Sequence, residues 1–216
     1  MRILPLLLLC LTIGLNSQAQ ELSQQAHKKE IEQHRKAYKA KLLQDQRSPF
    51  YGKPEVLNKL QFYPSAPRYR VTCSFEATPD AEPFDMATYS GKTRPYIQYG
   101  QLQCPLDNGI VLYLAVYRNL MQIRMPHYRD RLFLPFRDAT NYEATYGGGR
   151  YLDLSTSDIK NQQITIDFNK SYNPWCAFSD GYNCPIPPRA NHLEIAIPAG
   201  EKVFAPKVVE MGDGGR

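Results

Sequence analysis

The chain has 216 residues, and its 26 lysines and arginines outnumber its 21 aspartates and glutamates. This length allows one domain with a sizeable hydrophobic core and leaves little room for two. The basic residues are spread along the chain and form no stripe with a recognisable motif, which argues against a nucleic-acid-binding protein. Seventeen prolines and fifteen tyrosines favour strands joined by stiff turns over a helical fold.

The N-terminus is typical of a signal peptide. Arg2 supplies a positive charge, residues 3–15 are apolar, and Ser17 and Ala19 are small residues at the positions that determine cleavage. The apolar run is too short to span a bilayer as a helix of the mature protein. We therefore predict a signal peptide over 1–19 and a periplasmic or secreted protein without a stable membrane anchor.

The next segment, residues 20–47, predicts a helix. It lacks proline and glycine and is rich in Gln, Lys, Glu and Ala, which are good helix formers. Its apolar residues form only a ragged stripe: Leu22, Ala26, Ile31, Tyr38 and Leu42. Two interpretations stay open. The segment is either a solvated helix docked by one edge or a helix that binds a partner or a surface.

Turn-forming residues follow the helix, so residues 48–68 are expected to be a linker. Beyond the linker, strand-like runs recur at Tyr69–Glu76, Ile110–Tyr117, Arg131–Phe136, Arg150–Leu154, Gln163–Phe168 and His192–Ile197. The triplet 107–109, Asp-Asn-Gly, predicts a hairpin turn before the second of these runs. Short strands at near-regular spacing predict a mainly β fold, an antiparallel β-sandwich or barrel-like domain over 69–206. A disordered tail is expected over 207–216.

The cysteines support an oxidising compartment. Cys10 lies inside the leucine run of the predicted signal peptide with no small residue before it, so lipid attachment is not expected there. The other four form an even count, which in an exported chain indicates two disulfides. Cys176 and Cys184 bracket one loop and are the expected pair. Cys73 and Cys104 lie in separate strand-like runs, so their pairing is possible but needs proximity in the fold.

The histidines carry no catalytic or metal-binding motif. His27 and His34 lie on the charged helix. A zinc site made of Cys176, Cys184 and His192 is the alternative to the disulfide, because all three side chains bind Zn²⁺. Their spacing is longer than that of a zinc knuckle, and an oxidising compartment favours the disulfide. We therefore expect no metal and no cofactor.

A dense group of polar and aromatic side chains marks the candidate site. Its members are Arg137, Asp138, Asn141, Tyr146, Arg150, Asp167, Asn169, Tyr172 and Asn173. If the strands that carry them are neighbours, Arg150 meets Asp138 or Asp167. One interpretation is a structural ion pair with turn-capping side chains at Asp138 and Asn141. The other is a polar cleft where arginines bind an anionic ligand and carboxylates act as acid or base.

Two other features adjoin this group. The glycines at 147–149 lead into a strand-like run and not into a helix, so we expect positive φ, a bulge or a close backbone crossing there in place of a phosphate-binding loop. The loop from Tyr172 to Asn191 is long for a compact domain. It is expected to be held by its two cysteines, its prolines and the chain's only tryptophan, and to form a rigid rim or lid.

Several of these motifs resemble the bacterial and archaeal domain-of-unknown-function family 1684. The resemblance covers residues 60–201, through PFRDATN at 135–141, TYGGGRYLDL at 145–154, DFNKSYNPWCAF at 167–178, CPIPP at 184–188 and AGE at 199–201. It implies no known activity, substrate or cofactor. The family often has Asn-Arg-Leu where this chain has Asn191-His192-Leu193, which makes His192 a poor candidate for a ligand or catalyst.

Two functions remain open from the sequence. The first is an exported binding or accessory module with a rigid polar pocket for a small or anionic ligand. The second is a hydrolase-like enzyme that uses Asp138 or Asp167 as acid or base, with Arg150 stabilising negative charge. The sequence lacks the G-x-S-x-G, H-E-x-x-H and phosphate-loop motifs. Because no nucleophile–base pair is recognisable, the binding module is favoured.

Overall fold

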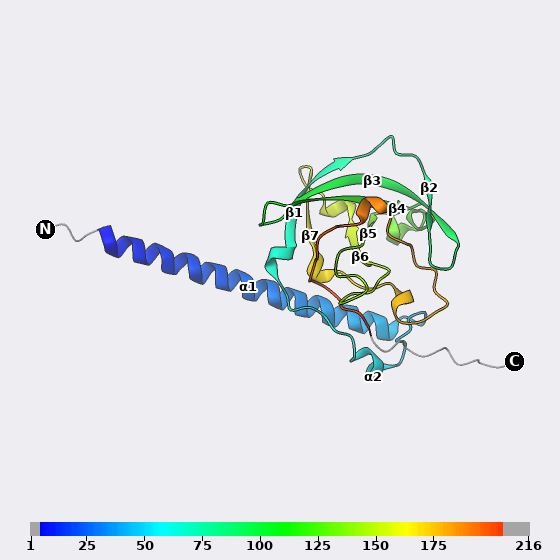
Figure 1. Ribbon diagram of the computed structural model, residues 1–216, viewed down its shortest axis with the longest axis horizontal. Coiled ribbons are helices and arrows are strands. Elements are labelled where there is room, and N and C mark those ends of the chain that lie inside the picture. The colour runs from blue at the N-terminus through cyan, green and yellow to red at the C-terminus, as the bar shows by residue number, and fades with distance from the viewer. Residues whose placement is uncertain (1–4, 205–216) are drawn as a thin grey trace.

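One long helix, α1 (Pro5–Gln44), precedes a compact β domain (Figure 1). The computed structural model describes the backbone of residues 5–204 and the side chains of residues 21–204. The tail predicted over 207–216 therefore lies outside the described residues. The helix predicted over 20–47 is confirmed and ends at Gln44. No helix in the described part of the chain is long and apolar enough to cross a membrane.

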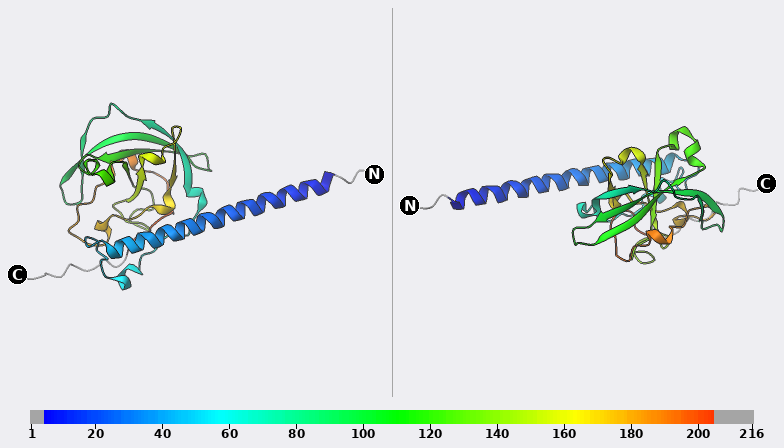
Figure 2. Two further views of the ribbon diagram at one scale, coloured as in Figure 1. Left: turned by 180° about the vertical axis from the view of Figure 1, so that it is seen from behind. Right: turned by 90° about the horizontal axis from the view of Figure 1, so that it is seen from above.

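Only the C-terminal part of α1 lies against the domain, and its N-terminal part projects away from it (Figures 1 and 2). Ile31 and Leu42 are buried against the domain, whereas Leu22 is 62 % exposed. Arg35 adds a polar contact by donating to the Tyr63 carbonyl oxygen at 2.8 Å. The described part of the helix is thus docked by one edge.

Seven strands form a single antiparallel sheet that curls into a half-barrel (Figures 1 and 2). They are β1 (Arg70–Ala77), β2 (Phe84–Ala87), β3 (Thr93–Pro105), β4 (Val111–Asn119), β5 (Arg131–Phe136), β6 (Arg150–Ser155) and β7 (Gln163–Asp167). The order across the sheet is β6-β5-β4-β3-β1-β7, with β2 paired to β3. The mainly β, antiparallel, barrel-like fold with an N-terminal helix is therefore confirmed.

The expected hairpin turn joins β3 to β4. The Leu106 backbone N–H donates to the Ile110 carbonyl oxygen at 2.8 Å, and Gly109 has φ 81°. This positive φ explains why glycine is favoured at that position of the turn. The sequence did not predict β2 or the first half of β3, where proline and charged residues hide the strand pattern.

The strand predicted over 192–197 is wrong. This segment is irregular and forms only an isolated parallel bridge, between His192 and Arg137. Leu193 still donates to the Arg137 carbonyl oxygen at 2.8 Å, but the Ile197 backbone N–H donates to the Asp138 carboxylate at 3.2 Å. The pairing with the backbone of residues 137–139 therefore ends at Ile197, where a charged side chain replaces the backbone partner.

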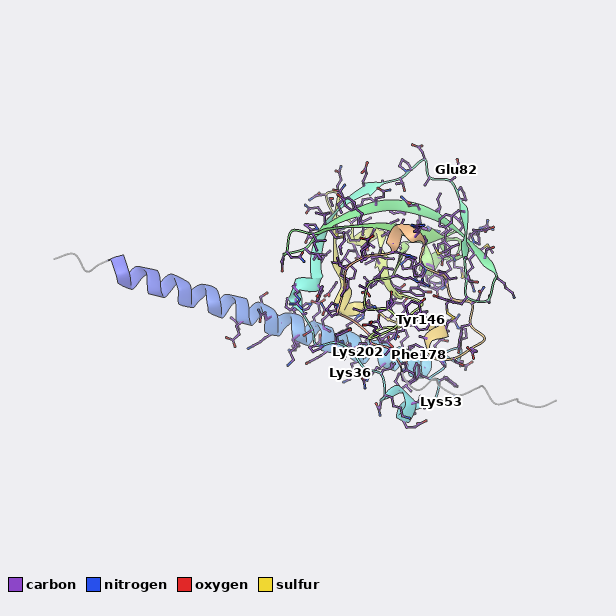
Figure 3. The ribbon with its side chains drawn as sticks, in the orientation of Figure 1. Lys36, Lys53, Glu82, Tyr146, Phe178 and Lys202 are labelled. Carbon is purple, nitrogen blue, oxygen red and sulfur yellow. A yellow bond between two sulfur atoms is a disulfide. The ribbon has the colours of Figure 1, made fainter. Side chains whose placement is uncertain are left out.

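The segment expected to be a linker, residues 48–68, is packed. It contains the short helix α2 (Pro54–Leu57), and its Phe50 is fully buried. The Phe50 ring contacts the rings of Phe178 and Phe204 at centroid distances of 4.8 and 5.6 Å. Phe178 lies on the α1 side of the domain, far from Glu82 in the β1–β2 connection (Figure 3). Leu42 of α1 belongs to the same buried cluster as these three rings. This cluster therefore fixes the C-terminal end of α1 to the domain.

Both cysteine pairs lie at disulfide distance. Cys73 and Cys104 lie on the neighbouring strands β1 and β3, with their sulfur atoms 2.02 Å apart. They belong to the main core, which fills the half-barrel. Cys176 and Cys184 close the loop after β7, with Cα atoms 6.2 Å apart. Two disulfides are typical of proteins from oxidising compartments.

Candidate functional site

Arg150 and Asp138 form an ion pair inside the domain. The Arg150 Nη2 atom lies 2.5 Å from Asp138 Oδ2, and both side chains are 0 % exposed. Arg150 also donates to the carbonyl oxygens of Ala199 and, at 2.9 Å, Ile197. Its guanidinium lies over the Phe136 ring, 5.1 Å from the centroid. The pair therefore joins the start of β6 to the irregular C-terminal segment and presents no charge to solvent.

The loop after β5 is held by its own polar side chains. The second carboxylate oxygen of Asp138 accepts from the backbone N–H of Thr140 at 2.9 Å. Asn141 donates to the Thr145 hydroxyl and to the Tyr146 carbonyl oxygen, both at 2.9 Å. Gly149 ends this loop with φ 89°, next to the Phe136 carbonyl oxygen, where a Cβ atom would not fit. These side chains order the loop.

Asp167 pairs with His27 and not with Arg150. Asp167 Oδ2 lies 3.0 Å from His27 Nε2, and both side chains are buried. Its Oδ1 atom accepts from the backbone N–H and the side-chain amide of Asn169 at 3.0 and 2.8 Å. The sequence placed His27 on the charged helix without a role, and the structure gives it a buried partner. His27 is one turn before buried Ile31, and this spacing places both on the docked edge.

Glu201 is a buried carboxylate that the sequence did not single out. It is 0 % exposed and accepts from the Tyr38 hydroxyl at 3.1 Å. The backbone N–H and side-chain amide of Asn173 donate to it at 3.1 and 3.0 Å. Burial raises the pKa of Glu201 from 4.5 to about 8, against the opposing effect of these hydrogen bonds. Tyr38 belongs to α1, so this contact also docks the helix.

Arg137 and Tyr146 form a separate surface group. The Arg137 guanidinium contacts the Tyr89 hydroxyl at 3.0 Å, and the Tyr89 and Tyr146 rings lie 6.2 Å apart. Burial raises the pKa of Tyr146 to about 12. The fold thus divides eight of the nine grouped residues among four places: the Arg150 pair with its loop, the Asp167 pair, the Glu201 contact and this surface group. Tyr172 lies in none of them.

A cleft of about 990 Å³ lies between α1 and the sheet. The helix contributes Tyr38 and Lys41, and the sheet contributes side chains from β1, β3, β4, β5, β6 and β7. The disulfide-closed loop contributes Trp175 and Tyr182. Of the nine residues of the predicted polar site, Asp167 and Tyr172 line this cleft.

Arg131 lines the cleft and contacts a carboxylate and an aromatic ring. Arg131 donates to Asp153 at 2.7 Å, and both side chains are partly exposed. Its guanidinium lies over the Tyr128 ring, 5.5 Å from the centroid. Burial alone would lower the pKa of Arg131, but the nearby Asp153 carboxylate has the larger effect, so the pKa of Arg131 is raised. The Tyr172 pKa is raised well above 10 by burial and by the nearby Asp153.

Cationic side chains outnumber carboxylates around the cleft. The cations are Lys41, Arg47, Arg70, Arg94, Arg131 and Lys170, and the carboxylates are Asp45, Asp153, Asp158 and Asp167. Arg94 is exposed and makes no salt bridge with any side chain described here. Of the two arginines Arg94 and Arg131 that line the cleft, Asp153 is paired only to Arg131. An anion can be held here without displacing an existing ion pair.

Within the described residues, no group of three or more His, Cys, Asp or Glu side chains is placed to hold a metal ion. His192 Nε2 lies 3.0 Å from the Pro187 carbonyl oxygen. Cys176 and Cys184 are paired with each other.

The fold and the cleft define a single-sheet β domain whose curled sheet is closed on one side by a helix. The profile of the family described as "Protein of unknown function (DUF1684)" matches residues 55–202, and the chain belongs to that family. No curated protein sequence matches the chain.

A solved structure is similar over most of both chains. It is the solution NMR structure of the uncharacterized protein from gene locus rrnAC0354 of Haloarcula marismortui. The two share 32 % sequence identity, with 87 % of this chain and 96 % of that chain covered and a TM-score of 0.59. The fold of most of this chain is thus similar to that of the Haloarcula marismortui protein.

Proposed function

We propose that the protein is an exported binding or accessory module that holds a small anionic ligand in the cleft between α1 and the sheet. The observation that carries this proposal is Arg94, an exposed arginine that lines a cleft of about 990 Å³ together with Arg131 and makes no salt bridge among the described side chains. A guanidinium donates charge-assisted hydrogen bonds to carboxylate or phosphate oxygens. Concave sites with a few convergent polar groups are the usual places for small ligands.

The hydrolase-like alternative has less support. An enzyme needs a carboxylate that is open to a concave site. Asp138 is 0 % exposed and is bonded to Arg150. Asp167 borders the cleft, but His27 and Asn169 occupy its two oxygen atoms. Neither carboxylate is free to act as acid or base in this arrangement.

Binding can be measured with a probe that the protein already contains. Trp175 is the chain's only tryptophan and lines the cleft. Titration with inorganic phosphate is expected to change its fluorescence to saturation. Arg94→Gln should weaken the affinity about tenfold or more, the effect of losing a hydrogen bond to a charged group.

The matched control is Arg189→Gln, since Arg189 is exposed and does not line the cleft. This variant should bind phosphate as the wild type does. Equal affinities in the wild type and Arg94→Gln would contradict the proposed site, and so would the lack of any saturable signal.

Export is tested separately. Cleavage after Ala19 should give a mature protein that begins at Gln20. Among the described side chains of α1, the first to bond to the β domain is His27, so this cleavage would keep the docking contacts. N-terminal sequencing of protein recovered outside the cytoplasm checks the site. Recovery of the protein only from the cytoplasm, with residues 1–19 attached, would contradict export.

A further inference from the structure

Aromatic side chains line the cleft more densely than an inorganic anion requires. The lining rings are Tyr38, Tyr96, Tyr128, Phe133, Tyr151, Tyr172, Trp175 and Tyr182. They come from α1, three strands, the β4–β5 connection and the disulfide-closed loop. Segments distant in the sequence thus each place a ring at one cavity.

Five of these rings form a continuous row, and three of the five belong to a buried core cluster. The ring centroids of Tyr96 and Phe133 lie 5.7 Å apart, and those of Phe133 and Tyr151 lie 4.8 Å apart. Tyr172 continues the row at 5.9 Å from Tyr151, and Tyr38 of α1 ends it at 5.8 Å from Tyr172. These are distances at which aromatic pairs attract one another. The row runs from the strand that carries Arg94 to the helix.

Guanidiniums already stack on two more rings of the cleft. Arg131 covers the Tyr128 ring, and the Arg47 guanidinium lies 6.0 Å from the Trp175 centroid. Trp175 in turn contacts Tyr182 edge to face at 5.3 Å. Such a wall offers both cation–π and ring–ring contacts to a flat group.

We infer that the ligand of the cleft is a flat aromatic ring that carries a carboxylate or a phosphate. The inference rests on the proposed function and adds the ligand's chemical class. An inorganic anion would bond to Arg94 but leave the partly exposed rings of Tyr128, Trp175 and Tyr182 in water. A neutral ring would leave the guanidinium without its anion. The volume suits an organic ligand, because pockets for drug-sized molecules span roughly 300–1,000 Å³.

Three probes separate the two parts of the ligand: phenyl phosphate, inorganic phosphate and phenol. Each is titrated against the full chain, with Trp175 fluorescence as the signal and heat of binding as a second measurement. Phenyl phosphate is expected to bind about tenfold or more tightly than inorganic phosphate, as ring stacking of about 1.4 kcal/mol would give. Phenol should bind more weakly than phenyl phosphate.

Two variants assign the parts to side chains. Arg94→Gln should weaken phosphate and phenyl phosphate by the same factor. Tyr128→Leu keeps an apolar side chain in the cleft lining but removes the ring, so it should weaken the binding of phenyl phosphate alone. Arg189→Gln again serves as the control with unchanged affinity for both.

The outcomes distinguish this inference from the proposed function. If phosphate binds through Arg94 and phenyl phosphate binds no more tightly, the aromatic-ring inference is overturned while the anion site stands. If Tyr128→Leu weakens both probes equally, the ring acts only by holding Arg131, and the inference is also overturned. If neither anion binds, the proposed function itself is wrong.

Discussion

Arg150→Ala is expected to destabilise the protein by about 3–5 kcal/mol, the cost of breaking a buried ion pair by removing one partner. The substitution leaves the Asp138 carboxylate inside the domain with only the Thr140 and Ile197 hydrogen bonds. The carbonyl oxygens of Ala199 and Ile197 lose their guanidinium donors as well. Denaturant unfolding of wild type and variant at neutral pH measures the difference.

The matched control is Arg131→Ala, which breaks a second arginine–aspartate pair in the same sheet. Arg131 and Asp153 are 32 % and 41 % exposed, so water screens the carboxylate that remains. The expected cost is about 0–1 kcal/mol. Similar small losses in both variants would mean that water reaches Asp138 and that the Arg150–Asp138 pair is part of an open site.

The strands could be predicted because their signals are local. β5 was located to the residue, since Arg131–Phe136 is a short apolar run between polar turns. The β3–β4 hairpin follows from the conformational preference of its Asn-Gly pair. The segment 192–197 has an alternating pattern, and its first residues do bond to the backbone of Arg137 and Ala139, just after β5. The ladder stops at Ile197, because the side chains of Asp138 and Arg150 bond to its backbone groups. The hydrophobic pattern of a segment does not show which groups lie next to that segment in the fold.

The candidate site shows the same limit more strongly. The charge density around Arg150 predicted its pairing with a carboxylate, but exposure separates an ion pair from a binding site, and exposure depends on the whole fold. His27 bonds to a residue 140 positions away, and Tyr38 to one 163 positions away. The cleft likewise combines α1 with rings from the far end of the sequence, so no local motif marks it.

Glu201 is expected to make the stability of the protein fall as the pH rises from about 4.5 to about 8. The unfolded chain loses the Glu201 proton near 4.5, whereas burial raises the pKa of the folded protein's carboxyl group to about 8. Between these values the folded state holds a proton that the unfolded state has lost, so raising the pH favours unfolding. The contribution is fully present below the lower value and is lost as the pH passes the upper one.

The size of this effect is set by the distance between the two pKa values. Each pH unit within the window costs about 1.4 kcal/mol, so roughly 4–5 kcal/mol separates the two ends. Glu201→Gln removes the titrating group. The unfolding free energy of this variant should therefore fall less steeply with pH than that of the wild type, by about 1.4 kcal/mol per pH unit within the window. Denaturant melts of both proteins at several values between pH 5 and pH 8 measure the two slopes.

Tyr38→Phe tests the same group from the helix side. The substitution removes the hydroxyl that donates to the Glu201 carboxylate and leaves the ring in place. Because this hydrogen bond lowers the pKa of Glu201, its loss should move the upper end of the pH window to higher values. If the unfolding free energies of the wild type and Glu201→Gln change with pH in parallel, Glu201 does not titrate in this range. Tyr38→Phe would then leave the pH dependence of stability unchanged.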